Sequence, residues 1–379
     1  MRVEVRPELL EWARERAGLS VDAVVQRLPK FEQWERQEAQ PTLRQLEQFA
    51  RLTYTPIGYL FLPEPPVERL PIPDFRTVAD TGVARPSPDL LDTLYTCQQR
   101  QEWFRDYARA EGQEPVAVIG QASVDSDIEV VAANMRAALG FDLAERRRMP
   151  TWTDALRRFI EQAENLGVLV MVNGVVGNNN RRKLNPNEFR GFALVDDLAP
   201  LVFVNGADTK NGQMFTVAHE LAHIWLGQSA LSDTTAATVP ANRVERWCNQ
   251  VAAEFLVPLN ALRAEIRRGT DPADESNRLA RVFKVSSLVI LRRMHDAGAL
   301  GRDEMWTAYE AELERLRAIP KGSGGDFYLT QAVRVSKRFA RALVSSTIEG
   351  QTLYRDAFRL LGFSKLDTFR ELGKNLGTM

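Results

Sequence analysis

The sequence predicts an α+β protein that is mostly α, and three observations carry this prediction. Helical periodicity dominates both ends of the chain. Three short stretches in the middle, at 168–172, 189–196 and 200–206, are apolar and rich in β-branched or aromatic residues, as strands are. A proline-rich stretch separates the first helical part from the rest. Three strands are too few for a barrel, so we expect a small three-stranded sheet packed on helices.

Length and composition bound the class of protein. A chain of 379 residues can form two or three domains, and 44% apolar with 26% charged residues is typical of soluble globular proteins. The sequence has no apolar run of about eighteen residues and no signal-peptide pattern at its start. The two cysteines, Cys97 and Cys248, cannot form a disulfide framework, so we expect a cytoplasmic protein. A net charge of −1 means that nucleic-acid binding would require a local basic face.

The first predicted domain, residues 1–63, consists of short helices. Leu10, Ala13 and Ala17 follow the spacing of one helical face, and Thr42 with Gln45 three residues later forms the capping box of another helix. The stretch 64–88 gathers prolines that disfavour helix and central strand, so it is predicted to be a linker.

Residues 89–320 contain helices and the three strands and are predicted to form the central domain. The glycine-rich stretch "PKGSGGDF" is a flexible hinge before a C-terminal helical module at 321–379. Four basic residues of this module recur at helical spacing, which is typical of a solvated face and sometimes of a surface for phosphate or an acidic partner. We expect the module to dock a partner. The four residues are Arg334, Lys337, Arg338 and Arg341.

The motif "FTVAHELAHIWLG" at 215–227 contains two of the three histidines of the chain. Residues four apart lie on the same face of an α-helix, so His219 and His223 can direct two imidazole nitrogens at one metal ion. Glu220 lies about 100° further round the helix, where it can reach a water on that ion without being a ligand. Leu221, Ala222 and Trp225 suit the opposite, buried side. The alternative is that the two histidines are solvent-facing or hydrogen-bonded in a core.

A catalytic zinc ion takes three protein ligands and keeps one open position. Glu245, 22 residues after His223, lies in the helical stretch "NRVERWCNQVAAEFLVP" and is the candidate third ligand. Asn249 follows at i+4 on the same face and is expected to orient one of the histidines by a hydrogen bond. Manganese or iron could occupy the same nitrogen and oxygen ligands. The prediction is a Zn²⁺ site made of His219, His223 and Glu245.

The expected chemistry is hydrolysis of a peptide bond. Zinc lowers the pKa of a bound water, and Glu220 is the predicted general base, which later returns the proton to the leaving amine. The stretch 189–196 is either the sheet edge along which a substrate strand adds or an ordinary core strand. The polar loop "VGNNNRRKLNPNE" at 176–188 could cover the site.

Three segments, "EFRGFALVDDLAPLVFVNGAD", "MFTVAHELAHIWLG" and "ERWCNQVAAEFLVP", resemble the ImmA/IrrE family of bacterial metallopeptidases in their order and spacing. The resemblance covers roughly residues 70–320. It implies a zinc endopeptidase of bacterial or phage origin that cleaves a regulatory protein, typically a transcriptional repressor, and so regulates transcription. It also implies that His219, His223 and Glu245 are the ligands and that Glu220 is the base. Some family members are antitoxin partners, and the alternative function is a DNA- or toxin-binding antitoxin with a structural or vestigial zinc site.

The N-terminal segment is similar to an Xre-type helix-turn-helix domain through "LSVDAV", "FEQWERQEAQPT" and "LEQFARLTYTPIGYLF". Its turn and recognition helix are shorter than usual and contain Pro29, and Gln37 stands where a glycine usually follows. Such a unit would bind duplex DNA in the major groove or dock on a protein. If it binds DNA, the side chains expected to face bases or phosphates are Lys30, Gln33, Arg36 and Gln37.

Overall fold

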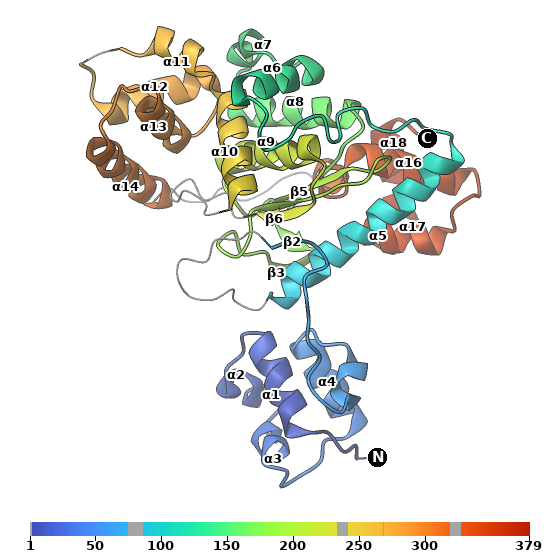
Figure 1. Cartoon of the computed structure of the whole chain (residues 1–379). Coiled ribbons are helices and arrows are strands. Elements are labelled where there is room, and N and C mark those ends of the chain that lie inside the picture. The colour runs from blue at the N-terminus through green and yellow to red at the C-terminus, as the bar shows by residue number, and fades with distance from the viewer. Residues whose placement is uncertain (1, 75–85, 233–241, 268, 319–326) are drawn as a thin grey trace. The chain divides into compact units, whose positions relative to one another are not determined.

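The computed structural model of the chain describes residues 2–74, 86–232, 242–267, 269–318 and 327–379 (Figure 1). Part of the predicted 64–88 linker and nearly all of the predicted hinge at 320–327 lie outside the described residues. The described residues form two compact units. The first consists of residues 2–71 with 86–94, and the second of residues 72–74 with the described residues from 95 onward, so the division falls within one long helix.

The first unit is a small helical bundle. Its elements are α1 (Pro7–Arg16), α2 (Val21–Val25), α3 (Phe31–Glu35), α4 (Leu43–Leu52) and the 3₁₀ helix η1 (Ile57–Phe61). The predicted capping box is confirmed, because Thr42 and Gln45 satisfy each other's backbone N–H groups at the start of α4. The bundle has its own buried core, which includes Leu9, Leu10, Val24, Phe31, Trp34, Leu46 and Phe49.

The second unit contains most of the helices and all the strands. Its helices before the sheet are α5 (Pro88–Ala110, shared with the first unit), α6 (Ile128–Leu139), α7 (Leu143–Arg148) and α8 (Trp152–Asn165). Its helices within and after the sheet are α9 (Lys210–Leu226), α10 (Arg243–Leu256), α11 (Leu259–Glu265), α12 (Pro272–Phe283), α13 (Ser287–Asp296), α14 (Arg302–Ala318), α15 (Phe327–Arg334), α16 (Lys337–Ile348), α17 (Tyr354–Leu361) and α18 (Leu366–Leu376). In the described part of the chain, none of these helices combines the length and the apolar character of a membrane-spanning segment.

The main sheet has four strands in the order β1-β5-β4-β6. β1 (Leu169–Asn173) pairs in parallel with β5 (Leu201–Asn205), and β4 (Gly191–Leu194) pairs antiparallel with both β5 and β6 (Ala230–Ser232). A separate hairpin joins β2 (Val175–Val176) to β3 (Asn179–Lys183). The fold class is therefore confirmed, and each of the three predicted strands is present.

Two features of the sheet differ from the prediction. β6 is a fourth strand. It was not predicted because three residues are too few to show the alternation of apolar and polar side chains that marks a strand. Its pairing places β4 in the interior of the sheet, so the interpretation of 189–196 as a free edge for substrate is wrong. The stretch 176–188 is also not simply a loop, because part of it forms β3.

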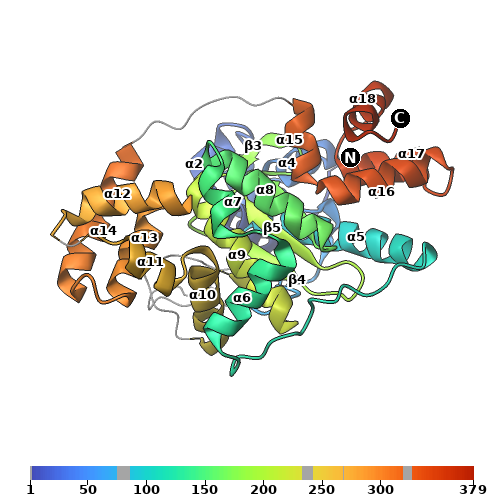
Figure 2. The same ribbon diagram turned by 90° about the horizontal axis from the view of Figure 1, so that it is seen from above.

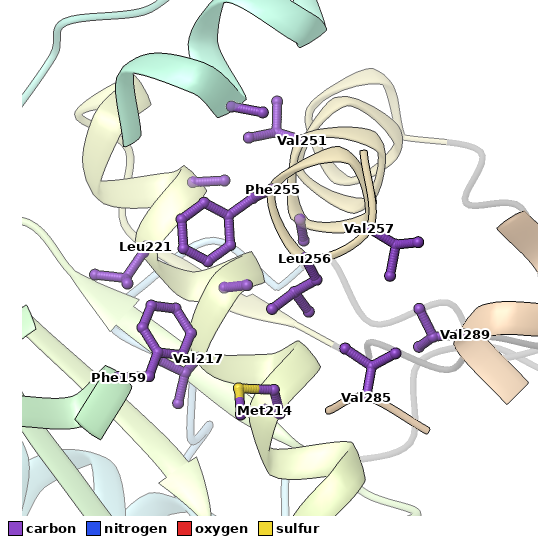
Figure 3. Close-up of a cluster of buried hydrophobic side chains, with 14 of the residues drawn as sticks. Phe159, Met214, Val217, Leu221, Val251, Phe255, Leu256, Val257, Val285 and Val289 are labelled. Atoms are coloured by element: carbon purple, nitrogen blue, oxygen red, sulfur yellow. The ribbon is translucent and has the colours of Figure 1, made fainter. Parts of the chain in front are cut away.

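Helices cover both faces of the sheet (Figure 1). Val170 and Val202 face α8 and α9 in the main core, whereas Met171 on the opposite face contacts Cys97 and Arg100 of α5. The period of two along the strands produces this division. Figure 3 shows the α9–α10 part of the core, where Leu221, Phe255 and their neighbours converge. In Figure 2, α11–α14 and α15–α18 lie at opposite ends of the unit.

The C-terminal helices are integrated into the second unit, with α15 and α16 packing on β1. The four basic residues predicted to form a solvated face or a phosphate surface all contact the rest of the unit, and of the four only Arg341 is exposed. Arg334 donates to Asn178 (3.1 Å), Lys337 pairs with Glu161 (3.3 Å), Arg338 donates to Gln113 (3.1 Å), and Arg341 donates to the Leu376 carbonyl (3.4 Å). Helical spacing alone could not distinguish solvent from a neighbouring helix.

Candidate metal centre

The histidine pair lies in the middle of α9, a helix with defined ends. The Thr209 side chain accepts a hydrogen bond from the Gly212 N–H and caps its start. Gly227 ends it in the left-handed region, with φ of 68°, at a point where the backbone of Gly120 approaches closely. Every residue from Thr216 to Leu226 is buried. The side of α9 opposite the histidines is buried, as expected. The side that carries the histidines is buried as well, which was not expected.

Glu245 is supplied by the first turn of α10. The Asn242 side chain caps this helix by accepting from the backbone N–H groups of Val244 (2.8 Å) and Glu245 (3.4 Å). Because the cap fixes the backbone of Glu245 itself, it also fixes where the carboxylate can reach. α10 packs against α9, and this packing directs the carboxylate at the two imidazoles.

The three predicted ligands converge on one point. The Nε2 atoms of His219 and His223 are 3.2 Å apart, and the Glu245 oxygens lie 3.2 Å from the first and 3.0 Å from the second. A tetrahedral zinc ion bound at about 2.0–2.1 Å needs ligand nitrogens about 3.3 Å apart. The three groups are the one cluster of possible metal ligands found among the described residues. Their types and spacing fit a zinc ion.

The charge states of the cluster also suit a cation. Burial alone would raise the pKa of Glu245, but His219 and His223 outweigh it and hold that pKa at about 2. Burial lowers the pKa of His223, with Glu245 acting against the shift and His219 with it. A carboxylate therefore faces an imidazole that favours its neutral form, and these are the forms that bind a metal.

Glu220 lies beside the cluster rather than in it. A Cβ atom placed on Gly191 of β4 would lie 2.8 Å from Glu220 Oε1, so the glycine makes room for this carboxyl group. Burial, and next the charge of Glu245, raise the pKa of Glu220 well above its usual range, against an opposing interaction with the Ser232 hydroxyl. Neither Glu220 oxygen makes a well-formed hydrogen bond in the described part of the chain. A buried carboxyl group with a raised pKa is suited to proton transfer.

Ser232 is a member of the site that the sequence did not indicate. Its hydroxyl lies 3.3 Å from His223 Nε2 and 3.4 Å from Glu245 Oε1. It belongs to β6, where it pairs with Gly191, so the end of the β4–β6 pair lies against the whole cluster. Only the three-residue strand, which the sequence does not reveal, brings this serine to the site.

Asn249 lies one turn after Glu245, as expected, but it forms no hydrogen bond to either histidine in the described residues. Asn249 Oδ1 and His219 Nδ1 are both buried without a hydrogen-bond partner there. These are the two kinds of atom that the predicted bond would join, an amide acceptor and an imidazole nitrogen. The orienting role of Asn249 stays a prediction.

A pocket of about 440 Å³ lies beside the cluster, between α6, α9, α10 and α13. Phe215 is one turn before His219, with 6.5 Å between their ring centroids, and it lines the pocket together with Asn249. The remaining lining is apolar at Ile128, Ala253, Leu259 and Val289, with charged groups that include Glu129, Arg246 and Arg292.

The predicted DNA-contacting residues belong to the first unit. Lys30, Gln33, Arg36 and Gln37 are all exposed around α3, which is only five residues long. Gln37 has a φ of 59°, the left-handed conformation that favours the glycine it replaces. Arg36 pairs with Glu32 (3.2 Å). DNA binding by these residues stays a prediction.

The fold and the site together define a class of domain: a mixed sheet packed on an HExxH helix that a second, glutamate-bearing helix accompanies. Residues 163–295 match the family model of the IrrE N-terminal-like domain, the peptidase family M78, so this part of the chain is similar to a peptidase domain. The matched segment contains all four predicted ligand and base residues. A second model, described as a domain of unknown function (DUF8813), matches residues 335–375. Comparison with curated proteins returned no match.

Proposed function

We propose that this chain is a zinc-dependent endopeptidase that cleaves a regulatory protein, such as a transcriptional repressor, and so regulates transcription. The observation that carries the proposal is the convergence of His219, His223 and Glu245 within 4.8 Å, inside the segment that matches a peptidase family. The exposed residues around α3 support a further role of the first unit in binding duplex DNA or a protein partner.

The residues divide the chemistry among them. When bound, the zinc ion activates a water molecule and polarises the peptide carbonyl group. Glu220 takes the proton from the attacking water and later delivers it to the leaving amine. His219, His223 and Glu245 would hold the ion, and the Ser232 hydroxyl would position the Glu245 carboxylate by a hydrogen bond. The pocket lined by Phe215 and Asn249 offers room for a substrate side chain.

One observation favours a second candidate function. His219, Glu220 and His223 have no exposed surface, and Glu245 is 1% exposed. A centre without exposed surface gives a substrate no access to the metal. This burial supports an antitoxin or transcription factor in which the metal stabilises the fold and no bond is cleaved.

The substitution Glu220→Gln separates the two functions, because zinc retention does not require this carboxylate and hydrolysis does. We expect equal zinc content in both proteins, measured by mass spectrometry of the metal. Cleavage of repressors encoded beside the gene should fall by at least about 10²-fold. Glu310→Gln, the same change on an exposed helix, should cleave like the unmodified protein. Equal zinc with no cleavage of any candidate by the unmodified protein would favour the antitoxin.

A further inference from the structure

The outermost strand of the sheet is covered. β6 is the last strand in the order β1-β5-β4-β6, and only one of its sides pairs with β4. An edge strand normally presents unpaired backbone groups to solvent. Nevertheless Ala230, Leu231 and Ser232 have no exposed surface. Something therefore occupies the outer side of this strand.

The chain itself supplies the cover, through residues 72–74. The Leu231 N–H donates a hydrogen bond to the Pro73 carbonyl (3.0 Å), and Asp74 forms a parallel bridge with Leu231. Residues 72–74 belong to the same compact unit as β6. The contact is thus the addition of one short extended segment to the edge of the sheet.

This contact lies next to the metal centre. Ser232 directly follows Leu231, and its hydroxyl is 3.3 Å from His223 Nε2. Its pairing partner Gly191 adjoins Glu220. An extended chain on the outer edge of β6 therefore lies next to Ser232, whose hydroxyl contacts the predicted ligands His223 and Glu245. Of the two strands whose end lies against the cluster, β4 is interior and β6 is at the edge, so a substrate backbone could add there only to β6.

We propose that residues 72–74 are an autoinhibitory strap, which must leave β6 before an extended, unfolded segment of a substrate protein can take its place. The inference rests on the proposed endopeptidase function. It explains why the metal centre of such an enzyme has almost no exposed surface. The strap follows directly on residue 71, the end of the first stretch of the N-terminal unit. A ligand of that unit that binds only when the strap is detached would therefore activate the enzyme.

The strap is tested by loosening it. Replacing Pro71 and Pro73 by glycine makes the detached segment more flexible and favours release by about two- to fivefold per proline. The probe is a fluorescent peptide with the sequence of residues 66–78, PVERLPIPDFRTV, added to zinc-loaded full-length protein that carries Glu220→Gln. We expect the loosened protein to bind the peptide at least about fourfold more tightly than its parent, with faster amide exchange at Leu231.

A second variant locks the strap. Strand partners lie about 4.8 Å apart, within the Cα range that a disulfide can bridge, so Asp74→Cys with Leu231→Cys should close the contact when oxidised. The oxidised protein should not bind the peptide, and the same protein reduced should bind it; Asp74→Cys alone should bind it in both states. Equal peptide affinity in the parent, loosened, oxidised and reduced proteins would overturn the proposal and leave residues 72–74 as a permanent cover of the edge.

A cleavage assay distinguishes failure of the strap proposal from failure of the proposed endopeptidase function. With Glu220 intact and β-casein as an unstructured substrate, the loosened protein should cleave at least about fourfold faster and the oxidised protein not at all. Peptide exchange on β6 without cleavage of any protein would contradict the peptidase and keep the strap. Cleavage at the same rate by the loosened and the oxidised protein would contradict the strap and keep the peptidase.

Discussion

Glu220 occupies space that any side chain at position 191 would fill. The closeness is not limited to the carboxyl group, because a Cβ atom there would also lie 2.6 Å from Thr216 Cγ2 and 2.8 Å from the Phe203 carbonyl oxygen. The backbone atom cannot yield as a side chain can. The position of the proposed general base therefore depends on a glycine in a strand that supplies none of the predicted ligands.

Gly191→Ala should consequently lower both the stability and the proposed activity, although it adds only one methyl group. We expect the free energy of unfolding to fall by about 1–3 kcal/mol, as for other overpacked cores, and cleavage to fall with little loss of zinc. Chemical denaturation and metal analysis measure the two effects. Gly301→Ala, where a Cβ atom meets nothing within 4 Å, is the matched control and should change stability by less than about 0.5 kcal/mol. An unchanged cleavage rate in Gly191→Ala would contradict this role of the glycine.

Site residues that lie on one helix can be predicted from the sequence. Site residues that strand pairing brings together cannot. His219 and His223 could be paired from their spacing, because four residues make one helical turn. Glu245 required the assumption that a second helix passes nearby, and the structure brings it within 3.2 Å of both rings. Gly191 and Ser232 reach the site through strand pairing, which no local pattern encodes.

Among the elements, α10 is held at its C-terminal end by three arginines from other helices. Arg136 donates to the carbonyls of Glu254 (2.8 Å) and Phe255 (3.3 Å), Arg146 donates to that of Leu256, and Arg293 donates to that of Val257 (2.9 Å). The last carbonyls of a helix lack partners within the helix and carry its negative dipole end. Burial lowers the pKa of Arg146 to about 9, and repulsion from Arg136 adds to this effect.

Removing one of these donors should be costly. Arg136→Met keeps the aliphatic stem but leaves two buried carbonyls without their charged partner, so we expect a loss of about 1.5–3 kcal/mol in the free energy of unfolding. Urea denaturation of the zinc-loaded protein measures it. Arg157→Met, which removes an exposed pair with Asp154 on α8, should cost less than about 0.5 kcal/mol. Equal losses in the two variants would show that the carbonyl contacts contribute nothing.

Element prediction succeeded where a segment was long enough to show its period. The capping box of α4 and strands β1, β4 and β5 could all be read from the sequence. β6 and β2 are two or three residues long, and the basic residues of α16 contact residues that are distant in sequence. Tertiary pairing decides the structure of such segments.

For the molecule as a whole, the two units have separate cores of buried residues. A bound metal stabilises the unit that binds it, by about 4 kcal/mol when free zinc exceeds the dissociation constant a thousandfold. A chelator should therefore speed amide exchange in α9 and α10 and leave exchange in α1 and α4 unchanged, as hydrogen-exchange mass spectrometry would show. Phe49→Ala, in the core of the first unit, should have the reverse pattern. Chelator effects of equal size in both units would contradict the separation.

The arginines on the last turn of α10 have a kinetic consequence for the metal. The Asn242 cap holds the other end of the same helix, where Glu245 lies, so α10 is fixed at both ends. The two imidazoles lie mid-helix on α9 and are buried as well. We therefore expect a bound zinc ion to exchange slowly, with a residence time set by how rarely α9 and α10 separate.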